Sequence, residues 1–198
     1  MSDQPSVPSR LRVIFRKLAS LPIRARQIYL AMMGVDRGTQ LLLRGQHQES
    51  FRRDGKILPF DEVEFRSFSQ NGEDGILWYV FSLIGSTNKR CVEICAGSGY
   101  QCNSANLILN HGWIGLLFDG NAKLIERARM FYATHPDSCA FPPRLVHSWI
   151  TTENINALIE SNGMTGDIDL LSLDMDGIDY WIWDTIDVIR PRVVIAEV

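Results

Sequence analysis

The chain has 198 residues, of which 45% are apolar, and this suffices for one buried core plus an appendage. Its formal net charge of −3 conceals a division. Residues 1–60 carry eleven Lys and Arg against four acids, whereas residues 61–198 carry nine against nineteen. No nucleic-acid partner is expected, and no secretory signal or membrane-spanning run is visible, so we expect a cytoplasmic protein.

Residues 1–60 predict a basic helical N-terminal arm and a linker. Leu11, Ile14 and Leu18 recur at helical spacing among Arg and Lys, and residues 23–33 read as a second short helix. Residues 34–60 show little periodicity, which predicts a linker with a helical turn or two. Such an arm suits a peripheral membrane contact or a protein contact, although a solvated basic helix is the plainer interpretation.

Residues 61–198 predict a second, α/β domain, which begins with a polar loop that leads into a helix. Apolar residues at helical spacing run from Ile76 to Ile84 and give this helix one buried face. Glu73 and Asp74 lie near its start, where acids complement the helix dipole.

The sequence Cys91–Asn121 reads as strand, glycine turn, helix, strand and acid. Gly97 and Gly99 allow the sharp turn after the first strand, and residues 103–110 fit one crossover helix. The second strand ends at Asp119, where an acid can accept hydrogen bonds from both hydroxyls of a ribose. This βαβ unit predicts the binding site of an adenosine-containing cofactor.

Two residues of the unit favour S-adenosylmethionine over NAD. The dinucleotide fingerprint needs a third glycine, and that position holds Cys102. Glu93 lies inside the first strand, where a buried acid requires a cation or a hydrogen-bond donor. The ammonium group of the methionine half would supply one, directly or through water.

Three further strands are expected, at residues 144–147, 169–173 and 193–198. Residues 122–132, 151–159 and 182–189 are predicted to form the intervening helices, the last of them closed by Pro191. Trp149 follows the third strand, where it can either sandwich adenine or pack in the core.

Acids gather again where the fourth strand ends. Asp174, Asp176 and Asp179 lie at the rim where open α/β sheets bind ligands, and such a cluster needs a cation or a donor. Asp174 is the first candidate to contact the substrate or the cofactor's amino group, and Asp176 or His147 is the candidate base. Mg²⁺ held by Asp174 and Asp176 is an alternative use of these acids, and capping of the next helix is another.

Tyr180 and Trp183 lie three residues apart and therefore share one helical face. They can stack on a substrate, but packing in the core is the commoner role of such residues.

Four motifs in this order resemble the FkbM-like family of class I S-adenosylmethionine-dependent methyltransferases. They are SQNGEDGI at 69–76, VEICAGSG at 92–99, GLLFDGN at 115–121 and LSLDMDGIDYW at 171–181. The resemblance covers residues 66–198 and implies a Rossmann-like, mostly parallel sheet with helices on both faces. It also implies methylation of a hydroxyl on a small-molecule acceptor, a sugar or a polyketide-like compound.

The expected cofactor-binding residues lie in four stretches of the chain. They are Gln70, Asp74, Glu93, Cys95, Gly97, Gly99, Asp119, Gly120, Asn121 and Trp149. The family's first motif has glycine where this chain has Cys95, which widens the turn by one side chain. Class I sheets have seven strands and this sequence supplies five, so we expect the C-terminal strands to be missing and the chain to be a fragment of a longer protein.

Two other functions remain open at this stage. Asp174 and Asp176 form a DxD pair that could hold a divalent ion and a nucleotide-sugar, as in a metal-dependent glycosyltransferase. A catalytically silent nucleotide-binding module is the third interpretation, since Cys95 and the missing strands could abolish activity.

Overall fold

The computed structural model describes residues 34–196, and their core is a five-stranded parallel sheet. The strand order is β3-β2-β1-β4-β5, so the order reverses between β1 and β4. The strands are β1 (Arg90–Ile94), β2 (Ile114–Asp119), β3 (Arg144–His147), β4 (Gly166–Leu173) and β5 (Ile189–Ile195). This topology confirms the predicted Rossmann-like α/β fold, and its reversal point is where such sheets bind ligands.

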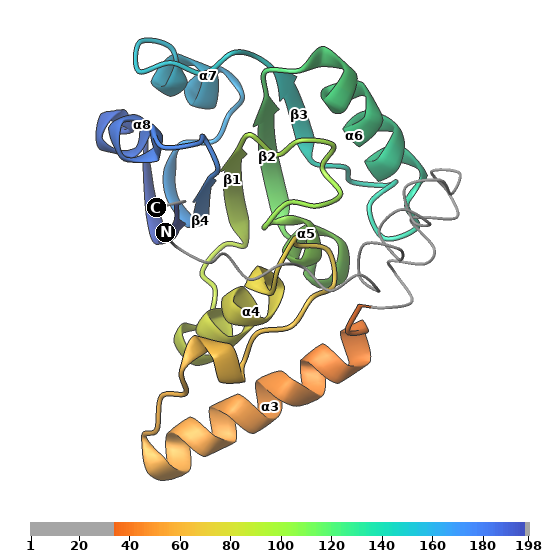
Figure 1. Ribbon diagram of the computed structural model, residues 1–198, viewed down its shortest axis with the longest axis vertical. Coiled ribbons are helices and arrows are strands. Elements are labelled where there is room, and N and C mark those ends of the chain that lie inside the picture. Colours follow the sequence, from red (N-terminus) through yellow and green to blue (C-terminus); the bar gives the residue numbers. More distant parts are fainter. Residues whose placement is uncertain (1–33, 197–198) are drawn as a thin grey trace, which may run out of the picture. The chain divides into compact units, whose positions relative to one another are not determined.

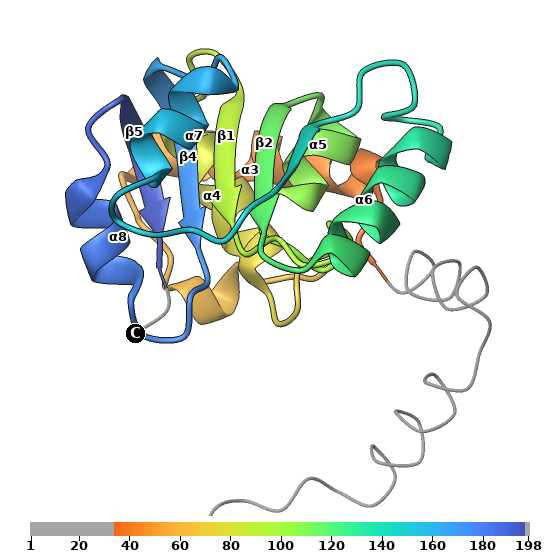
Figure 2. The ribbon, with the colours of Figure 1, turned by 90° about the horizontal axis from the view of Figure 1, so that it is seen from above.

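Helices cover both faces of the sheet (Figures 1 and 2). The helices of the described residues are α3 (Arg37–Asp54), α4 (Glu73–Ile84), α5 (Ala105–His111), α6 (Ala122–Thr134), α7 (Ile155–Ser161) and α8 (Asp179–Thr185), with a short 3₁₀ turn at Phe60–Glu62. Side chains of α4, α5 and α6 pack on one face, and side chains of α7 and α8 pack on the other. The strands are therefore buried on both sides, which explains their nearly continuous apolar sequences.

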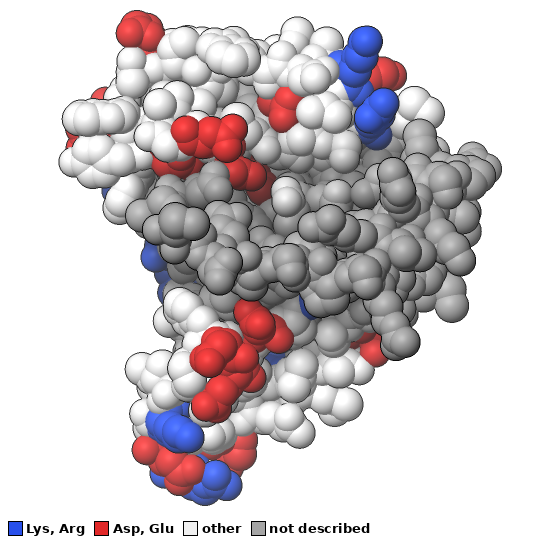
Figure 3. Space-filling model, in the orientation of Figure 1, with Lys and Arg blue, Asp and Glu red and all other residues white. Residues whose placement is uncertain are grey.

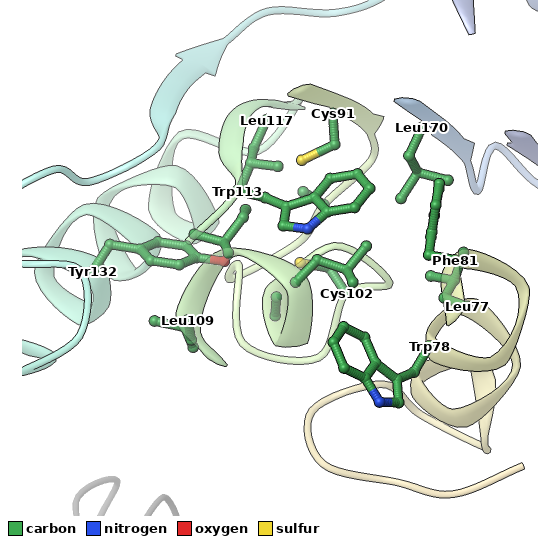
Figure 4. Packing of buried hydrophobic residues seen from close by; sticks show 14 of the residues in the cluster. Leu77, Trp78, Phe81, Cys91, Cys102, Leu109, Trp113, Leu117, Tyr132 and Leu170 are labelled. Carbon is green, nitrogen blue, oxygen red and sulfur yellow. The ribbon is translucent and has the colours of Figure 1, made fainter. Parts of the chain in front are cut away.

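The face covered by α4, α5 and α6 holds the larger aromatic cluster (Figure 4). Trp113 lies between Cys91 of β1 and Cys102 of the following turn, and Phe81 of α4 faces Leu170 of β4. Tyr132 of α6 is fully buried and inserts its ring from the opposite side. Aromatic side chains thus fix α4 and α6 against the same surface of the sheet.

Helix α3 corrects the expectation of a linker with a helical turn or two between residues 34 and 60. It has 18 residues, begins after Asp36, whose side chain accepts a hydrogen bond from Thr39 N at 3.1 Å, and ends at the left-handed Gly55. Its one fully buried residue is Gln40, which is polar. The helix therefore lacks the apolar stripe by which a sequence pattern reveals a helix.

Polar contacts attach α3 to the rest of the fold. The Gln40 side chain donates to Asn106 of α5, and its oxygen lies 2.7 Å from His111 Nε2. His111 in turn stacks on Trp78 with ring centroids 3.6 Å apart. Burial lowers the pKa of His111 to about 3, so this contact stays uncharged at neutral pH.

The C-terminal elements begin and end earlier than the sequence predicted. Helix α8 ends at Thr185, and Ile189 already starts β5, so the helix expected over 182–189 is present but its bounds are wrong. Pro191 lies inside β5 and does not close a helix. Because β5 pairs with β4 alone within the sheet, it is an edge strand, where proline is tolerated.

Three aromatic residues for which core packing was considered are exposed. Trp149 is 78% exposed, Tyr180 59% and Trp183 45%. Helix α8 has only seven residues and buries Asp179 and Ile182, so its aromatic side chains have no layer to cover them within the described part of the chain.

The two short helices expected between residues 11 and 33 lie outside the described residues. Within residues 34–196, no helix is both long enough and apolar enough to cross a membrane.

Candidate functional site

The turn after β1 has the backbone conformation that the glycine pattern predicted. Cys95, Gly97 and Gly99 all have positive φ angles, of 65°, 58° and 68°. A Cβ on Gly99 would lie 2.7 Å from the Tyr132 ring, so only glycine fits there. The Tyr132 hydroxyl donates to Gly99 O at 2.7 Å and holds the turn in place.

Two carboxylates hold this turn, one near each end. Asp119 accepts a hydrogen bond from Gly97 N at 2.8 Å, and Glu93 accepts from the backbone N of Asn103 and of Ser104, each at 2.8 Å. Glu93 pairs with Leu117 in the parallel register, so Glu93 and Asp119 point to the same face of the sheet. Both acids therefore hold the turn from the same face of the sheet.

Glu93 is almost completely buried, at 2% exposure. Burial raises its pKa, although the hydrogen bonds from Ser104 and Asn103 oppose that shift. The Ser104 hydroxyl and Ser104 N share one carboxylate oxygen, whereas the other oxygen has Asn103 N and a weaker contact of 3.5 Å to Ser172. A carboxylate oxygen can accept two strong bonds, so this second oxygen retains capacity for a ligand donor.

A cavity of about 500 Å³ opens beside the turn, at the carboxyl end of β1 and β4. Its size lies within the range of small-molecule sites. Of the predicted site residues, it brings together Gln70, Glu93, Cys95, Gly97 and Asp174. It lies at the reversal of strand order, where ligands bind to open sheets.

The cavity is acidic. Glu73, Glu93 and Asp174 line it, and no Lys or Arg does so among the residues that the structure describes. The pKa of Cys95 rises to about 11, first because the thiol is partly buried and then because Asp119, Asp174, Asp179 and Asp176 surround it with negative charge. The thiol is thus neutral at pH 7. Figure 3 shows acidic side chains in separate groups on the face of the molecule that is seen in Figure 1.

The loop before α4 forms one wall of the cavity. Asp74 is buried, and its Oδ2 accepts from the backbone N of Ser67, Phe68 and Ser69 at 2.6–2.8 Å. Glu73 accepts from Gly72 N at 2.9 Å. Asp74 does not line the cavity, so the structure gives it the role of holding the loop on which Gln70 lies.

Gly120, Asn121, Trp149 and His147 gather at the tip of β2, outside the cavity lining. The Trp149 ring lies against Gly120, where an added Cβ would be 2.8 Å from ring atom Cε3. His147 Nε2 is 3.1 Å from Gly120 O, and Asn121 caps α6 by accepting from Lys123 N at 3.0 Å. An exposed indole beside Gly120 leaves a flat apolar surface for an aromatic ligand group.

The acids after β4 divide into two kinds. Asp174 and Asp176 are exposed, whereas Asp179 is buried and accepts from Met175 N and Gly177 N. His147 ends β3, which is separated from β4 by β2 and β1, or about 14 Å at the usual strand spacing. His147 and Asp174 therefore cannot act on the same proton.

Mg²⁺ finds little support at Asp174 and Asp176. Within residues 34–196 there is no group of three or more His, Cys, Asp or Glu side chains that could hold a metal ion. The DxD pair alone supplies two exposed carboxylates on a turn whose Asp176 has a positive φ of 52°.

Sequence reasoning missed several cavity residues. Ser98, Gln101 and Asn103 line it from the turn, and Asn71 and Glu73 line it from the loop before α4. All five lie within or beside motifs that the sequence did single out. The signal was present, but a motif does not say which of its side chains face the ligand.

Comparisons with known proteins concern the fold alone. No protein-family model and no curated protein matches the chain. Among solved structures, it is similar to the crystal structure of an S-adenosylmethionine-dependent methyltransferase from Clostridium acetobutylicum ATCC 824, with 12% identity and a TM-score of 0.41. That likeness covers 76% of this chain and 53% of the other, so the chain spans about half the length of that protein.

Proposed function

We propose that the chain is an S-adenosylmethionine-dependent methyltransferase of the FkbM-like type, which methylates a hydroxyl group of a small molecule. The observation that carries this proposal is the acidic cavity beside a turn clasped by Glu93 and Asp119. S-Adenosylmethionine carries a sulfonium and an ammonium, and a cavity lined by acids without Lys or Arg favours such a cation.

The same charge disfavours the competing cofactors. NAD and nucleotide-sugars bring a pyrophosphate, which needs cations, a metal ion or a free helix N-terminus. At the start of α5, the backbone N of Asn103 and of Ser104 already donate to Glu93. The glycosyltransferase alternative is therefore not favoured.

We assign the remaining residues to the two ends of the ligand. Glu93 and Asp174 are proposed to bind the methionine end, and Asp119, Gly120, Asn121 and Trp149 the adenosine end. Asp119 already accepts from Gly97 N and Asn121 N, so the ribose hydroxyls would use its remaining lone pairs. Cys95 and Gly97 line the wall between these two groups.

The cofactor supplies an electrophilic methyl group, and the protein must hold an acceptor oxygen in line with it and remove a proton. Asp176 is exposed two residues beyond Asp174, so it is the proposed base that takes the acceptor's proton. A sugar or polyketide hydroxyl as acceptor and a cytoplasmic location both rest on the sequence.

Calorimetry with S-adenosylhomocysteine tests the proposal. We expect measurable binding to the unmodified chain, weakened by about 1–3 kcal/mol in Glu93→Ala and in Asp119→Ala, the scale of hydrogen bonds to charged groups. Asp167→Ala is the matched control, because Asp167 is an exposed acid at the other end of the sheet. Absence of binding to the unmodified chain, or equal affinity in all four proteins, would contradict the proposal.

A further inference from the structure

Two walls of the cavity come from separate parts of the chain. The loop wall, residues 66–74 before α4, contributes Gln70, and the turn wall, residues 97–104 after β1, contributes Asn103. No residue of α3 (Arg37–Asp54) lines the cavity, and Figure 1 shows α3 below α4, on the side away from the sheet. A contact between α3 and either wall would therefore act on a ligand indirectly.

Gln40 of α3 is fully buried and is joined to the loop wall through Ser67. Its Nε2 donates to Ser67 Oγ at 3.0 Å and to Val35 O at 2.8 Å, and Ser67 Oγ also donates to Val35 O at 2.7 Å. The backbone N of Ser67 donates to Asp74 Oδ2 at 2.7 Å, and this carboxylate holds the loop on which Gln70 lies. Buried hydrogen bonds thus run from α3 to the loop wall.

The same side chain contacts α5, which begins where the turn wall ends. Gln40 Nε2 donates to Asn106 Oδ1 at 3.1 Å, and Asn106 Nδ2 donates back to Gln40 Oε1 at 3.0 Å. Asn106 lies in the first turn of α5, two residues after Ser104, whose N–H donates to Glu93 at 2.8 Å. Because both amides are buried, displacing either one would leave polar groups of the other without a partner, which is costly.

We propose that Gln40 is a positioning residue, which holds the loop wall and the turn wall at the separation that the ligand requires. This inference rests on the proposed function and deepens it. A ligand that contacts both walls binds fully only to molecules in which both are in place, so its apparent Kd rises as that fraction falls. By linkage, the bound ligand must also stabilise the Gln40 contacts that favour its binding.

Amide hydrogen exchange in the ligand-free protein tests the link to each wall. Gln40→Ala should speed exchange both in residues 66–74 and in α5, because both lose a buried partner. Ser67→Ala removes the contact to the loop wall alone, so it should speed exchange in residues 66–74 and leave α5 unchanged. Gln48→Ala is the matched control and should leave both segments unchanged. Gln48 also joins α3 to α4, but it donates to Ser82 O at 3.0 Å, about 13 Å along α4 from Glu73.

Calorimetry with S-adenosylhomocysteine measures the consequence for binding. Gln40→Ala should weaken affinity at least about fivefold, the lower end of the usual coupling between two sites. Gln48→Ala should change it less than about twofold, as expected of a distant, independent position. In the unmodified chain, the ligand should slow hydrogen exchange in α3, and this protection should be lost in Gln40→Ala. A side chain that only stabilised the fold would transmit no such protection.

The outcomes separate this inference from the proposed function. If the unmodified chain binds S-adenosylhomocysteine and Gln40→Ala binds it as tightly as Gln48→Ala does, the role of Gln40 is overturned and the proposed function stands. If the unmodified chain does not bind it but Gln40→Ala speeds exchange in both segments, the proposed function fails and the link between the walls stands. Exchange that is unchanged by Gln40→Ala overturns the link.

Urea denaturation verifies that each variant is folded. If Gln40→Ala does not fold, Ser67→Ala decides, because it removes one hydroxyl and should still loosen the loop wall and weaken binding. Unchanged exchange in residues 66–74 together with unchanged affinity in Ser67→Ala would overturn the role of Gln40.

Discussion

Carboxylates lie at both ends of the sheet, but the groups that neutralise or hydrogen-bond them differ between the two ends. At the amino end, Asp169 of β4 is fully buried and accepts from the backbone N of Thr87, Asn88 and Lys89 at 2.7–2.9 Å. Arg192 of β5 lies 2.9 Å away and neutralises it. The hydrogen-bonding capacity of the Asp169 carboxylate is therefore used within the protein.

At the carboxyl end, the acids have backbone donors but no cation. Glu93 and Asp119 accept from N–H groups of the turn, and Asp174 is exposed at the cavity. No Lys or Arg forms a salt bridge with these acids in the described part of the chain. The difference indicates that the amino-end acid stabilises the fold, and it supports our proposal that the carboxyl-end acids bind a positively charged ligand.

The strongest test of this contrast is Asp169→Ala. The substitution leaves three backbone N–H groups and the Arg192 guanidinium without their acceptor, and breaking a buried ion pair in this way costs about 3–5 kcal/mol. Urea denaturation should report that loss in the free energy of unfolding. Affinity for S-adenosylhomocysteine should be unchanged wherever the variant is still folded.

Asp167→Ala is its matched control. Asp167 pairs with Arg190 at 2.8 Å, but both side chains are at least 70% exposed. Exposed ion pairs contribute at most about 1 kcal/mol, so Asp167→Ala should lower the free energy of unfolding by no more than that amount. Equal destabilisation by the two substitutions would show that the burial of Asp169 does not set its contribution.

The carboxyl-end turn was predictable because its chemistry is local. Gly97, Gly99 and Asp119 follow buried strands within thirty residues, and the parallel register brings the strand ends together without further information. Glu93 was also identified, since an acid inside an apolar strand needs a partner. The sequence did not reveal that this partner is the backbone of its own turn.

The amino-end cluster was not predictable from the sequence. Asp169 and Thr87 are separated by 82 positions, and Arg192 joins them only because β5 lies beside β4. Helix α3 was not predicted for a related reason. Its buried residue, Gln40, is polar and contacts residues far along the chain, so the helix has no apolar periodicity in the sequence. Long-range polar contacts have no periodic signature in a sequence.

The second prediction concerns pH. The stabilising effects of Asp169 and of Glu93 should change in opposite directions as the pH changes. The hydrogen bonds to Asp169 and its pairing with Arg192 lower its pKa from 3.8 to about 2, so its contribution is complete above about pH 4 and is lost as pH falls toward 2. The shift corresponds to about 2 kcal/mol. The stability difference between the unmodified chain and Asp169→Asn should therefore shrink over that window in urea titrations.

Glu93 should behave in the opposite way in the ligand-free protein. Burial raises its pKa above the ordinary 4.5, so the folded state holds its proton longer than the unfolded state does. Its stabilising effect is then lost as pH rises above about 4.5. The advantage of the unmodified chain over Glu93→Gln should shrink in that direction. If both variants followed pH with the same sign, the proposed division between the two ends would fail.

The smallest effect is expected from Cys95→Gly, which tests how strictly the turn depends on its first residue. A non-glycine residue at a φ of 65° costs about 1–2 kcal/mol, and glycine relieves that strain. Glycine also loses about 0.5–1 kcal/mol more in backbone entropy, and the half-buried thiol loses its packing. These terms nearly cancel, so the free energy of unfolding should change by less than about 1 kcal/mol.

Affinity for S-adenosylhomocysteine tests whether the Cys95 side chain contributes to ligand binding at the carboxyl end of the sheet. Because the thiol lines the cavity and is neutral, its removal should leave affinity equal or raise it by less than about tenfold. Cys95→Ser is the control, since it keeps the strained backbone and the side-chain volume. A loss of affinity in Cys95→Gly but not in Cys95→Ser would mean that the cavity depends on a side chain at this position. The acids alone would then be insufficient to hold the ligand.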